Sequence, residues 1–146
     1  MRVEREIVLP SSPVAAWEVL VDWERQADWM ADADRVQVVS AAREGVGTTV
    51  DVRTRVLNIP SFTERLEVTG WDPPRELRMA HRSFIRGVGT WTLTPSPAGC
   101  RFRWVEDLAL PVPLLGEAAL LIYRPFMRHL MGRAMRDLQT YVGSLP

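Results

Sequence analysis

The 146-residue chain contains no lysine, a single cysteine and only two histidines. Without a lysine amine, catalysis through a Schiff base on the protein is excluded. The lone Cys100 cannot form an intrachain disulfide or a cluster of cysteine zinc ligands. His81 and His129 lie far apart in the sequence and lack the spacing of a metal-binding pair. We therefore expect neither a metal ion nor a cofactor.

The chain also has no excess of positive or negative charge, because 18 acidic residues balance its 18 arginines. A net charge of zero provides no long-range field toward nucleic acid, so we expect no nucleic-acid partner. No apolar run reaches membrane-spanning length, and the charged start Met1–Glu6 lacks the apolar core of a signal peptide. We expect a bacterial, cytoplasmic protein.

The composition is that of a folded protein. Hydrophobic residues make up 47% of the chain and charged residues 25%, which is ordinary for a globular domain and wrong for a disordered one. A chain of this length is long enough to bury a real core. We predict one domain spanning residues 1–146.

The segment from Ile7 to Trp23 carries the clearest local signals. Ser12 can cap a helix by accepting a hydrogen bond from an early helical N–H, and Pro13 suits the first helical position. Four apolar residues then recur at helical spacing on one face: Val14, Trp17, Leu20 and Val21. The pattern predicts a strand over 2–9, a helix over 13–21 and a second short helix over 24–30. We expect Trp17 to be buried and structural, and Trp29 to plug one end of the core.

From about residue 35 to 111 the sequence consists of segments in which polar and apolar residues alternate, separated by turns rich in Gly, Pro and Asp. Alternation of this kind indicates half-buried strands, and short strands with such turns indicate an antiparallel meander. The predicted strands cover residues 35–42, 48–56, about 61–71, about 76–84, 87–93 and roughly 100–110.

The remainder of the chain, from Pro113 to Val142, has a helical pattern, with an apolar stripe from Leu120 to Val142. Pro125 cannot donate to the carbonyl of Leu121, so we expect a kink or a restart there. The predicted fold is α+β: a curved seven-stranded antiparallel sheet with two short helices and a long C-terminal helix over its concave face. Sheet and helix each bury the apolar face of the other.

Segments along the whole chain resemble the SRPBCC superfamily, the START-like, polyketide cyclase/dehydrase and lipid-transport group with a helix-grip fold. The resemblance rests on the opening Ile7–Trp23, Gly45–Gly47, Val68–Pro74, Trp91–Pro95, Gly99–Glu106 and Leu130–Leu138. It implies a protein with an internal cavity, whose ligand is a lipid, a polyketide or another aromatic metabolite.

Two residues are candidates for chemistry. On the last strand Glu106 is the one charged member of an apolar face that includes Trp104 and Leu108. It is a pocket acid or ligand anchor, a hydrogen-bonded glutamate near the exposed end of the strand, or a glutamate paired with a neighbouring arginine. His81 points with the apolar Met79 and is either an acid or base in the cavity or a hydrogen-bonded core histidine. In a meander one strand lies between the strands of Glu106 and His81, so the spacing leaves a His–Glu dyad open. The expected polar neighbours of Glu106 in the cavity are His81 or Tyr123.

Two features of the C-terminal third have competing interpretations. His129 lies among arginines, which favours a solvated polar face over an anion-binding stripe. The segment 108–123 is unusually apolar. It is interpreted as the entrance to the cavity, with a homodimer contact or a lipid-touching patch as alternatives.

These observations favour a cytoplasmic protein that binds a hydrophobic small molecule. One alternative is a polyketide aromatase/cyclase or dehydratase in which Glu106, His81 or Tyr123 moves protons, and another is a protein-interaction subunit that uses the apolar surface 108–123. A polar dyad inside the cavity would favour the enzyme, and a dry cavity would favour simple binding. The residues expected to line the ligand site are Val52, Met79, His81, Trp91, Trp104, Glu106, Leu108, Tyr123 and Met127.

Overall fold

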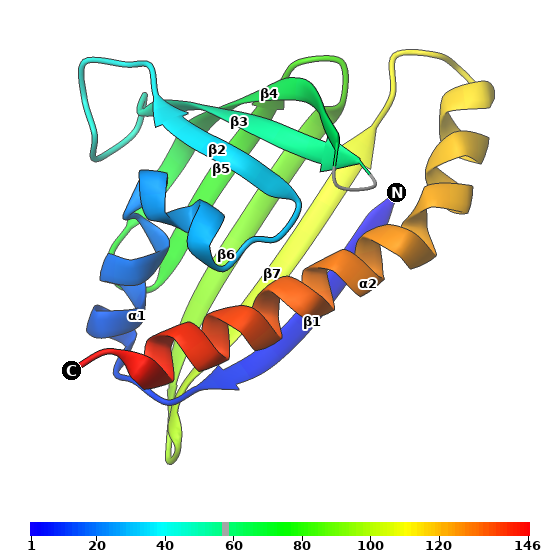
Figure 1. The fold of residues 1–146 in the computed structure, drawn as a ribbon. Helices are drawn as coiled ribbons and strands as arrows, with labels where there is room; N and C mark the ends of the chain where they lie inside the picture. Colours follow the sequence, from blue (N-terminus) through cyan, green and yellow to red (C-terminus); the bar gives the residue numbers. More distant parts are fainter. Residues whose placement is uncertain (57–58) are drawn as a thin grey trace.

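The computed structural model describes residues 1–56 and 59–146, and Figure 1 shows their arrangement. The elements are β1 (Arg2–Leu9), α1 (Pro13–Leu20), the 3-10 helix η1 (Trp23–Asp28), β2 (Ala33–Val38), β3 (Thr49–Val56), β4 (Ile59–Asp72), β5 (Glu76–Arg82), β6 (Arg86–Ser96), β7 (Gly99–Ala109) and α2 (Leu115–Ser144).

Within the described residues, seven strands form one antiparallel sheet in the order β1-β7-β6-β5-β4-β3-β2. Strands β2 to β7 are a continuous meander, and β1 joins the far edge beside β7. The sheet curls, and α2 runs across its concave side (Figure 1). The predicted α+β helix-grip architecture is confirmed.

The short helices form for the reasons the sequence indicated. The Ser12 hydroxyl accepts a hydrogen bond from the Ala15 N–H at 3.2 Å, and Pro13 occupies the first helical position. The second short helix is a 3-10 helix that begins at Trp23. The side chain of Trp17 is 7% exposed and packs edge-on against Trp71, with ring centroids 5.1 Å apart. Trp17 is buried in the core as predicted.

Three predicted strand ends are wrong by a few residues, and one of them is the end of β6, which lies at Ser96 instead of Leu93. β2 ends at Val38 instead of Ala42, because the Ser40 hydroxyl accepts from the Thr49 N–H at 2.9 Å and donates to the Ala42 carbonyl at 2.6 Å. These side-chain hydrogen bonds draw residues 40–42 into the connection to β3. β5 ends at Arg82 instead of continuing to residue 84.

Of the two predicted outcomes at Pro125, a kink or a restart, the restart does not occur, because α2 is continuous through Pro125. Its axis nevertheless changes direction along its length, as Figure 1 shows between the yellow-orange beginning and the orange-red remainder. The helix covers the outer edge of β1 and hydrogen-bonds to its free carbonyls. Arg124 donates to Arg2 O at 3.1 Å, Arg128 to Glu4 O at 3.2 Å, and Gln139 to Val8 O at 2.8 Å. The edge strand is thereby protected from pairing with another chain.

In the described part of the chain, no helix is both long enough and apolar enough to cross a bilayer.

Candidate functional site

A cavity of about 140 Å³ lies between the concave face of the sheet, α2 and the segment that joins η1 to β2. Most of its wall is apolar, and a smaller polar part comes from carboxyl, imidazole, amide and hydroxyl groups. The lining residues are Gln26, Met30, Asp32, Ala33, Val52, Thr54, Phe62, Glu64, Leu66, Leu77, Met79, His81, Ile85, Gly89, Trp91, Trp104, Glu106, Leu108, Tyr123, Met127, Leu130 and Met131.

All nine residues that the sequence suggested for the ligand site line this one cavity. They come from elements far apart in the chain: β3, β5, β6, β7 and α2. The strand residues point inward because side chains alternate along each strand and the apolar set faces the helix. Their placement is a fact of the fold, whereas their contact with a ligand stays a prediction.

Glu106 is buried on the inner face of β7, with Trp104 and Leu108 on the same face. Its side chain is held at both oxygens. The indole N–H of Trp104 donates to Oε1 at 2.7 Å, and His81 Nε2 lies 2.9 Å from Oε2. The predicted inward orientation and the predicted His81 neighbour are both present. The wall of the cavity therefore contains an anchored carboxylate.

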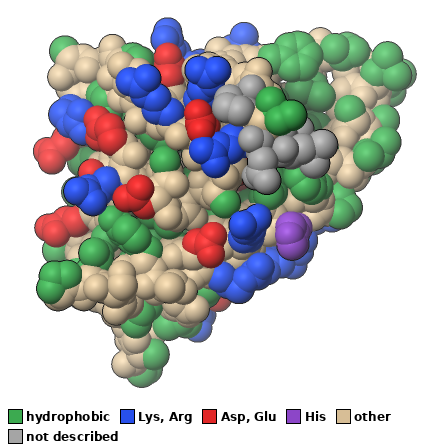
Figure 2. All heavy atoms as spheres, viewed as in Figure 1, with side chains coloured by type: hydrophobic (Ala, Val, Ile, Leu, Met, Phe, Trp, Pro, Cys, Tyr) green, Lys and Arg blue, Asp and Glu red, His purple; other side chains and the backbone are tan. Residues whose placement is uncertain are grey.

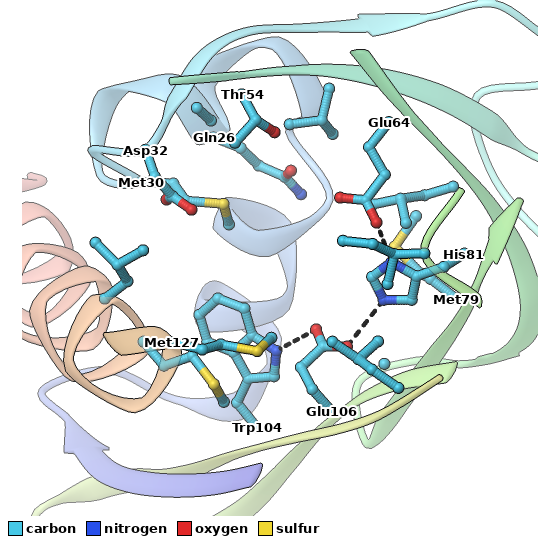
Figure 3. A pocket seen from close by; sticks show the side chains of 18 of the residues that line it. Gln26, Met30, Asp32, Thr54, Glu64, Met79, His81, Trp104, Glu106 and Met127 are labelled. Carbon is cyan, nitrogen blue, oxygen red and sulfur yellow. Dashed lines mark hydrogen bonds and ion pairs between the residues drawn. The ribbon is translucent and has the colours of Figure 1, made fainter. Parts of the chain in front are cut away.

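His81 is 8% exposed and lies between two carboxylates. Nε2 contacts Glu106, and Nδ1 forms a hydrogen bond with Glu64 Oε1. Burial opposes the charged imidazolium, but the hydrogen bonds to Glu106 and Glu64 outweigh it and raise the pKa of His81 to about 10. At neutral pH the ring is therefore protonated, and each of its N–H groups donates to a carboxylate. Figure 3 shows this chain, Trp104–Glu106–His81–Glu64, along one wall of the cavity.

The sequence interpretation placed a strand between His81 and Glu106, and that strand, β6, is indeed there. Strand β6 does not separate the two side chains, because the β6 residues that pair with His81 and Glu106 are glycines. Gly87 pairs with His81, and Gly89 pairs with Glu106. A Cβ at Gly89 would lie 2.8 Å from Glu106 Oε1. The missing side chains open a gap over β6 through which imidazole and carboxylate meet, and the motif Gly87-Val88-Gly89 was the signal in the sequence.

Sequence reasoning did not identify Glu64. It lies on β4 two residues before Leu66, the register partner of His81, and therefore on the same inner face. Its side chain is 16% exposed. Glu64 Oε1 contacts His81, while no hydrogen bond from the described residues reaches Oε2. The alternation of residues 64, 66 and 68 could have revealed its orientation.

Asp32 and Gln26 were missed as well, since they lie outside any regular strand pattern. Burial raises the pKa of Asp32, a backbone hydrogen bond lowers it, and the charge of Glu64 raises it further. Burial also raises the pKa of Tyr123, with added effects from Asp32 and Glu64. Figure 3 shows Asp32 and Glu64 on opposite sides of the cavity. Three ionisable groups therefore act on one another across it.

His129 is exposed on α2, as the solvated-face interpretation predicted. Two of the arginines near it, Arg124 and Arg128, are engaged with β1 carbonyls. Across the described ranges, no three His, Cys, Asp or Glu side chains are grouped as metal ligands would be.

Residues 1–143 match the family model described as polyketide cyclase/dehydrase and lipid transport. The chain belongs to this family. The polyketide cyclase/dehydrase and lipid-transport family is thus the one that the sequence motifs resembled. No curated protein matches the chain.

Several solved structures share the fold of this polyketide cyclase/dehydrase and lipid-transport chain. The protein TTHA0849 from Thermus thermophilus superposes with a TM-score of 0.79 at 21% identity, over 97% of each chain. A START superfamily protein from Mycobacterium smegmatis gives 0.76 at 12% identity, over 99% of each chain. The di-domain ARO/CYC StfQ from the steffimycin biosynthetic pathway gives 0.77 at 14% identity, over 97% of this chain and 50% of that one. At these identities the likeness shows the fold alone.

The apolar segment 108–123 leads from β7 into the first turns of α2, next to the cavity wall. Leu108 and Leu120 are buried, whereas Leu114, Leu121 and Ile122 are exposed. Figure 2 shows hydrophobic side chains gathered over this beginning of α2. An exposed apolar rim of this kind is typical of an entrance or an interaction surface.

Proposed function

We propose that the protein binds a small, mainly apolar molecule in the cavity and holds a polar group of that molecule at the Glu64–His81–Glu106 network. One observation carries the proposal: a buried, hydrogen-bonded chain of ionisable groups lies in an otherwise apolar cavity. Ligand sites are mostly apolar with a few precisely placed polar groups. Membership of the polyketide cyclase/dehydrase and lipid-transport family supports the same class of ligand.

The volume of the cavity limits what it can enclose. At about 140 Å³ it is similar to the engineered cavity of about 150 Å³ that binds benzene. Pockets for drug-sized ligands measure roughly 300–1,000 Å³. The cavity therefore encloses about one ring of a ligand, and a larger lipid or polyketide would extend outward past Tyr123 and Phe62, lining residues that are exposed.

Filling the cavity tests the proposal. Val52→Phe adds a ring inside it, since Val52 lines the cavity and is buried. Val88→Phe is the matched control, because Val88 is exposed on β6 and does not line the cavity. Binding of toluene and benzyl alcohol is measured by calorimetry or ligand-observed NMR. We expect at least a tenfold loss of affinity in Val52→Phe alone; no binding by the parent protein, or equal binding by both variants, would reject the proposal.

A ligand retained by the protein from its own host is the complementary test. Native mass spectrometry of the purified protein should detect a bound small molecule, which should be absent from Val52→Phe prepared in the same way.

A second candidate function is proton-transfer catalysis, as in a polyketide aromatase/cyclase or dehydratase. It is favoured by the His81–Glu106 contact of 2.9 Å inside the cavity, the polar dyad that distinguishes an enzyme from a simple binding protein. Both ring nitrogens of His81 are occupied, so the group free to act on a substrate is Glu64 Oε2. We propose Glu64 as the general base, with the imidazolium of His81 orienting its carboxylate.

A substrate with a carbon-bound acidic proton tests this candidate. The ring of 5-nitrobenzisoxazole opens to a coloured phenolate when a base removes that proton. We expect turnover that falls at least 100-fold in Glu64→Gln, within the range for general bases of about 10²–10⁴-fold. Glu67→Gln, which removes a carboxylate on the same strand that faces Arg82, is the control. Turnover no faster than with free acetate, or unchanged in Glu64→Gln, would exclude catalysis by this carboxylate.

A further inference from the structure

We propose that the polar group held in the cavity is a protonated amine, so that the ligand is an apolar or aromatic cation and not a carboxylate. This inference rests on the proposed binding function and specifies the chemistry of its ligand.

The cavity lining contains more acidic than basic side chains. All 18 basic residues of the chain are arginines, yet no arginine is among the residues that line the cavity. The lining groups that ionise are Asp32, Glu64, His81, Glu106 and Tyr123. The imidazolium of His81 balances one of the two carboxylates that it contacts. The network therefore carries one uncompensated negative charge, and Asp32 adds a further carboxyl group.

An uncompensated charge in a mostly apolar site is unfavourable, because it has lost much of its water. Burial raises the pKa of Asp32, a backbone hydrogen bond lowers it, and the negative charge of Glu64 raises it further. A cation placed between Glu64 and Asp32 would balance the uncompensated charge, whereas a second anion would add to it. Figure 3 shows the two side chains on opposite walls with the cavity between them.

The hydrogen-bonding groups give independent support. The donors of the network are already used: His81 donates from both nitrogens, and the Trp104 indole donates to Glu106. Gln26, which is 4% exposed, donates from Nε2 to Leu20 O at 2.8 Å. That bond fixes the amide orientation and leaves Oε1 as an acceptor that no described residue contacts.

The cavity therefore presents two acceptors that have no hydrogen-bond partner among the described residues, Glu64 Oε2 and Gln26 Oε1, and also the Asp32 carboxyl group, which accepts a backbone hydrogen bond. The donors that remain in the lining are neutral: the hydroxyls of Thr54 and Tyr123, the Trp91 indole N–H and the second N–H of the Gln26 amide. An ammonium group has three donors and no acceptor, so it complements this set. A carboxylate ligand would find only neutral donors free in the lining and would face like charge.

Four probes with one ring each separate charge from shape: benzylamine, benzyl alcohol, toluene and benzoate. Their affinities are measured at pH 7 by calorimetry or ligand-observed NMR. We expect benzylamine to bind at least tenfold more tightly than benzyl alcohol, and benzoate not to bind. Glu64→Gln should reduce the preference for benzylamine over benzyl alcohol at least tenfold, and Asp32→Asn should reduce it to a smaller extent.

Glu67→Gln serves as the matched control, since it removes the same charge from β4 outside the cavity, and should leave the preference unchanged. Equal affinities for benzylamine and toluene in the parent protein would overturn the inference while leaving the proposed binding function intact. Tighter binding of benzoate would do the same. Failure of all four probes to bind would reject the binding function itself. The probe series on the parent protein decides the matter even if Glu64→Gln does not fold.

Discussion

The two halves of α2 are both rich in large apolar residues, yet their surroundings are opposite. In the C-terminal half Met131, Met135 and Leu138 are buried against the sheet. In the N-terminal half Leu121 is 67% exposed and Ile122 is 81% exposed. One end of the domain is thus a closed core, and the other is an open end that surrounds the cavity entrance.

The contrast shows that the apolar side chains of a helix are buried only where another element packs against them. The closed end has such a layer in β1, β7 and α1, and includes Trp17, Trp71 and Phe102. At the open end the helix lies beside the cavity, and its outward side has no covering element among the described residues. Stability and binding should therefore depend on different ends of the molecule.

The largest expected effect is at the closed end. Trp17→Ala removes a buried indole that packs edge-on against Trp71. We expect the free energy of unfolding to fall by about 3–5 kcal/mol, the range for truncating large aromatic residues in cores. Denaturant unfolding measures it. An unchanged transition midpoint would show that the contact between α1 and the sheet contributes little.

A smaller loss is expected where the cavity wall has no room. Gly89→Ala places a methyl group 2.8 Å from Glu106 Oε1, which accepts from Trp104, and 3.0 Å from Oε2, which contacts His81, so the carboxylate must shift against these partners. We expect a destabilisation of about 1–3 kcal/mol, as for other overpacked sites. Gly143→Ala is the control, because its Cβ would lie 3.6 Å from Pro10 and alanine favours a helix. Equal stability of the two variants would contradict the tight approach at β6.

The pH dependence of stability probes the same wall. The pKa of His81 is raised from 6.5 to about 10, because the contacts with Glu106 and Glu64 outweigh burial. The folded state therefore holds this proton more tightly than the unfolded state. The resulting stabilisation is complete below pH 6.5 and is lost as the pH rises toward 10.

Unfolding measured between pH 6 and 10 should therefore show a steeper loss of stability in the parent protein than in His81→Gln. Parallel curves for the two proteins would mean that the imidazolium is not held by the carboxylates.

The smallest effect is expected at the open end. Ile122→Glu changes a side chain that is 81% exposed, so the free energy of unfolding should change by less than about 0.5 kcal/mol. A loss above about 1 kcal/mol that depends on protein concentration would show that this surface is covered in solution. It would then support the homodimer contact, the alternative interpretation of the apolar segment 108–123.

Much of the fold was predictable because its signals are local. The cap at Ser12, the alternation along β3 and β7, and the stripe on α2 identify their elements without knowledge of the partners. The inward orientation of Glu106 and His81 followed from alternation as well. An error arose where a side chain hydrogen-bonds to the backbone of other residues. The Ser40 hydroxyl ends β2 through its hydrogen bonds to Thr49 and Ala42.

The candidate site was predictable only in part. The lining residues on β3, β5, β6 and β7 could be chosen from their period-two alternation. Glu64 was overlooked although it alternates with Leu66 and Val68, and Asp32 lies outside any strand pattern. Their roles depend on which groups meet them across the sheet.

By itself, then, the sequence determined the element order, the apolar faces and the family, since these rest on periodicity and turn chemistry within short windows. Only the tertiary structure decided that His81 reaches Glu106 over Gly87 and Gly89, with Glu64 closing the network. Register and curvature determine which side chains share the cavity. The charge state of His81 follows from that shared space and not from its neighbours in the chain.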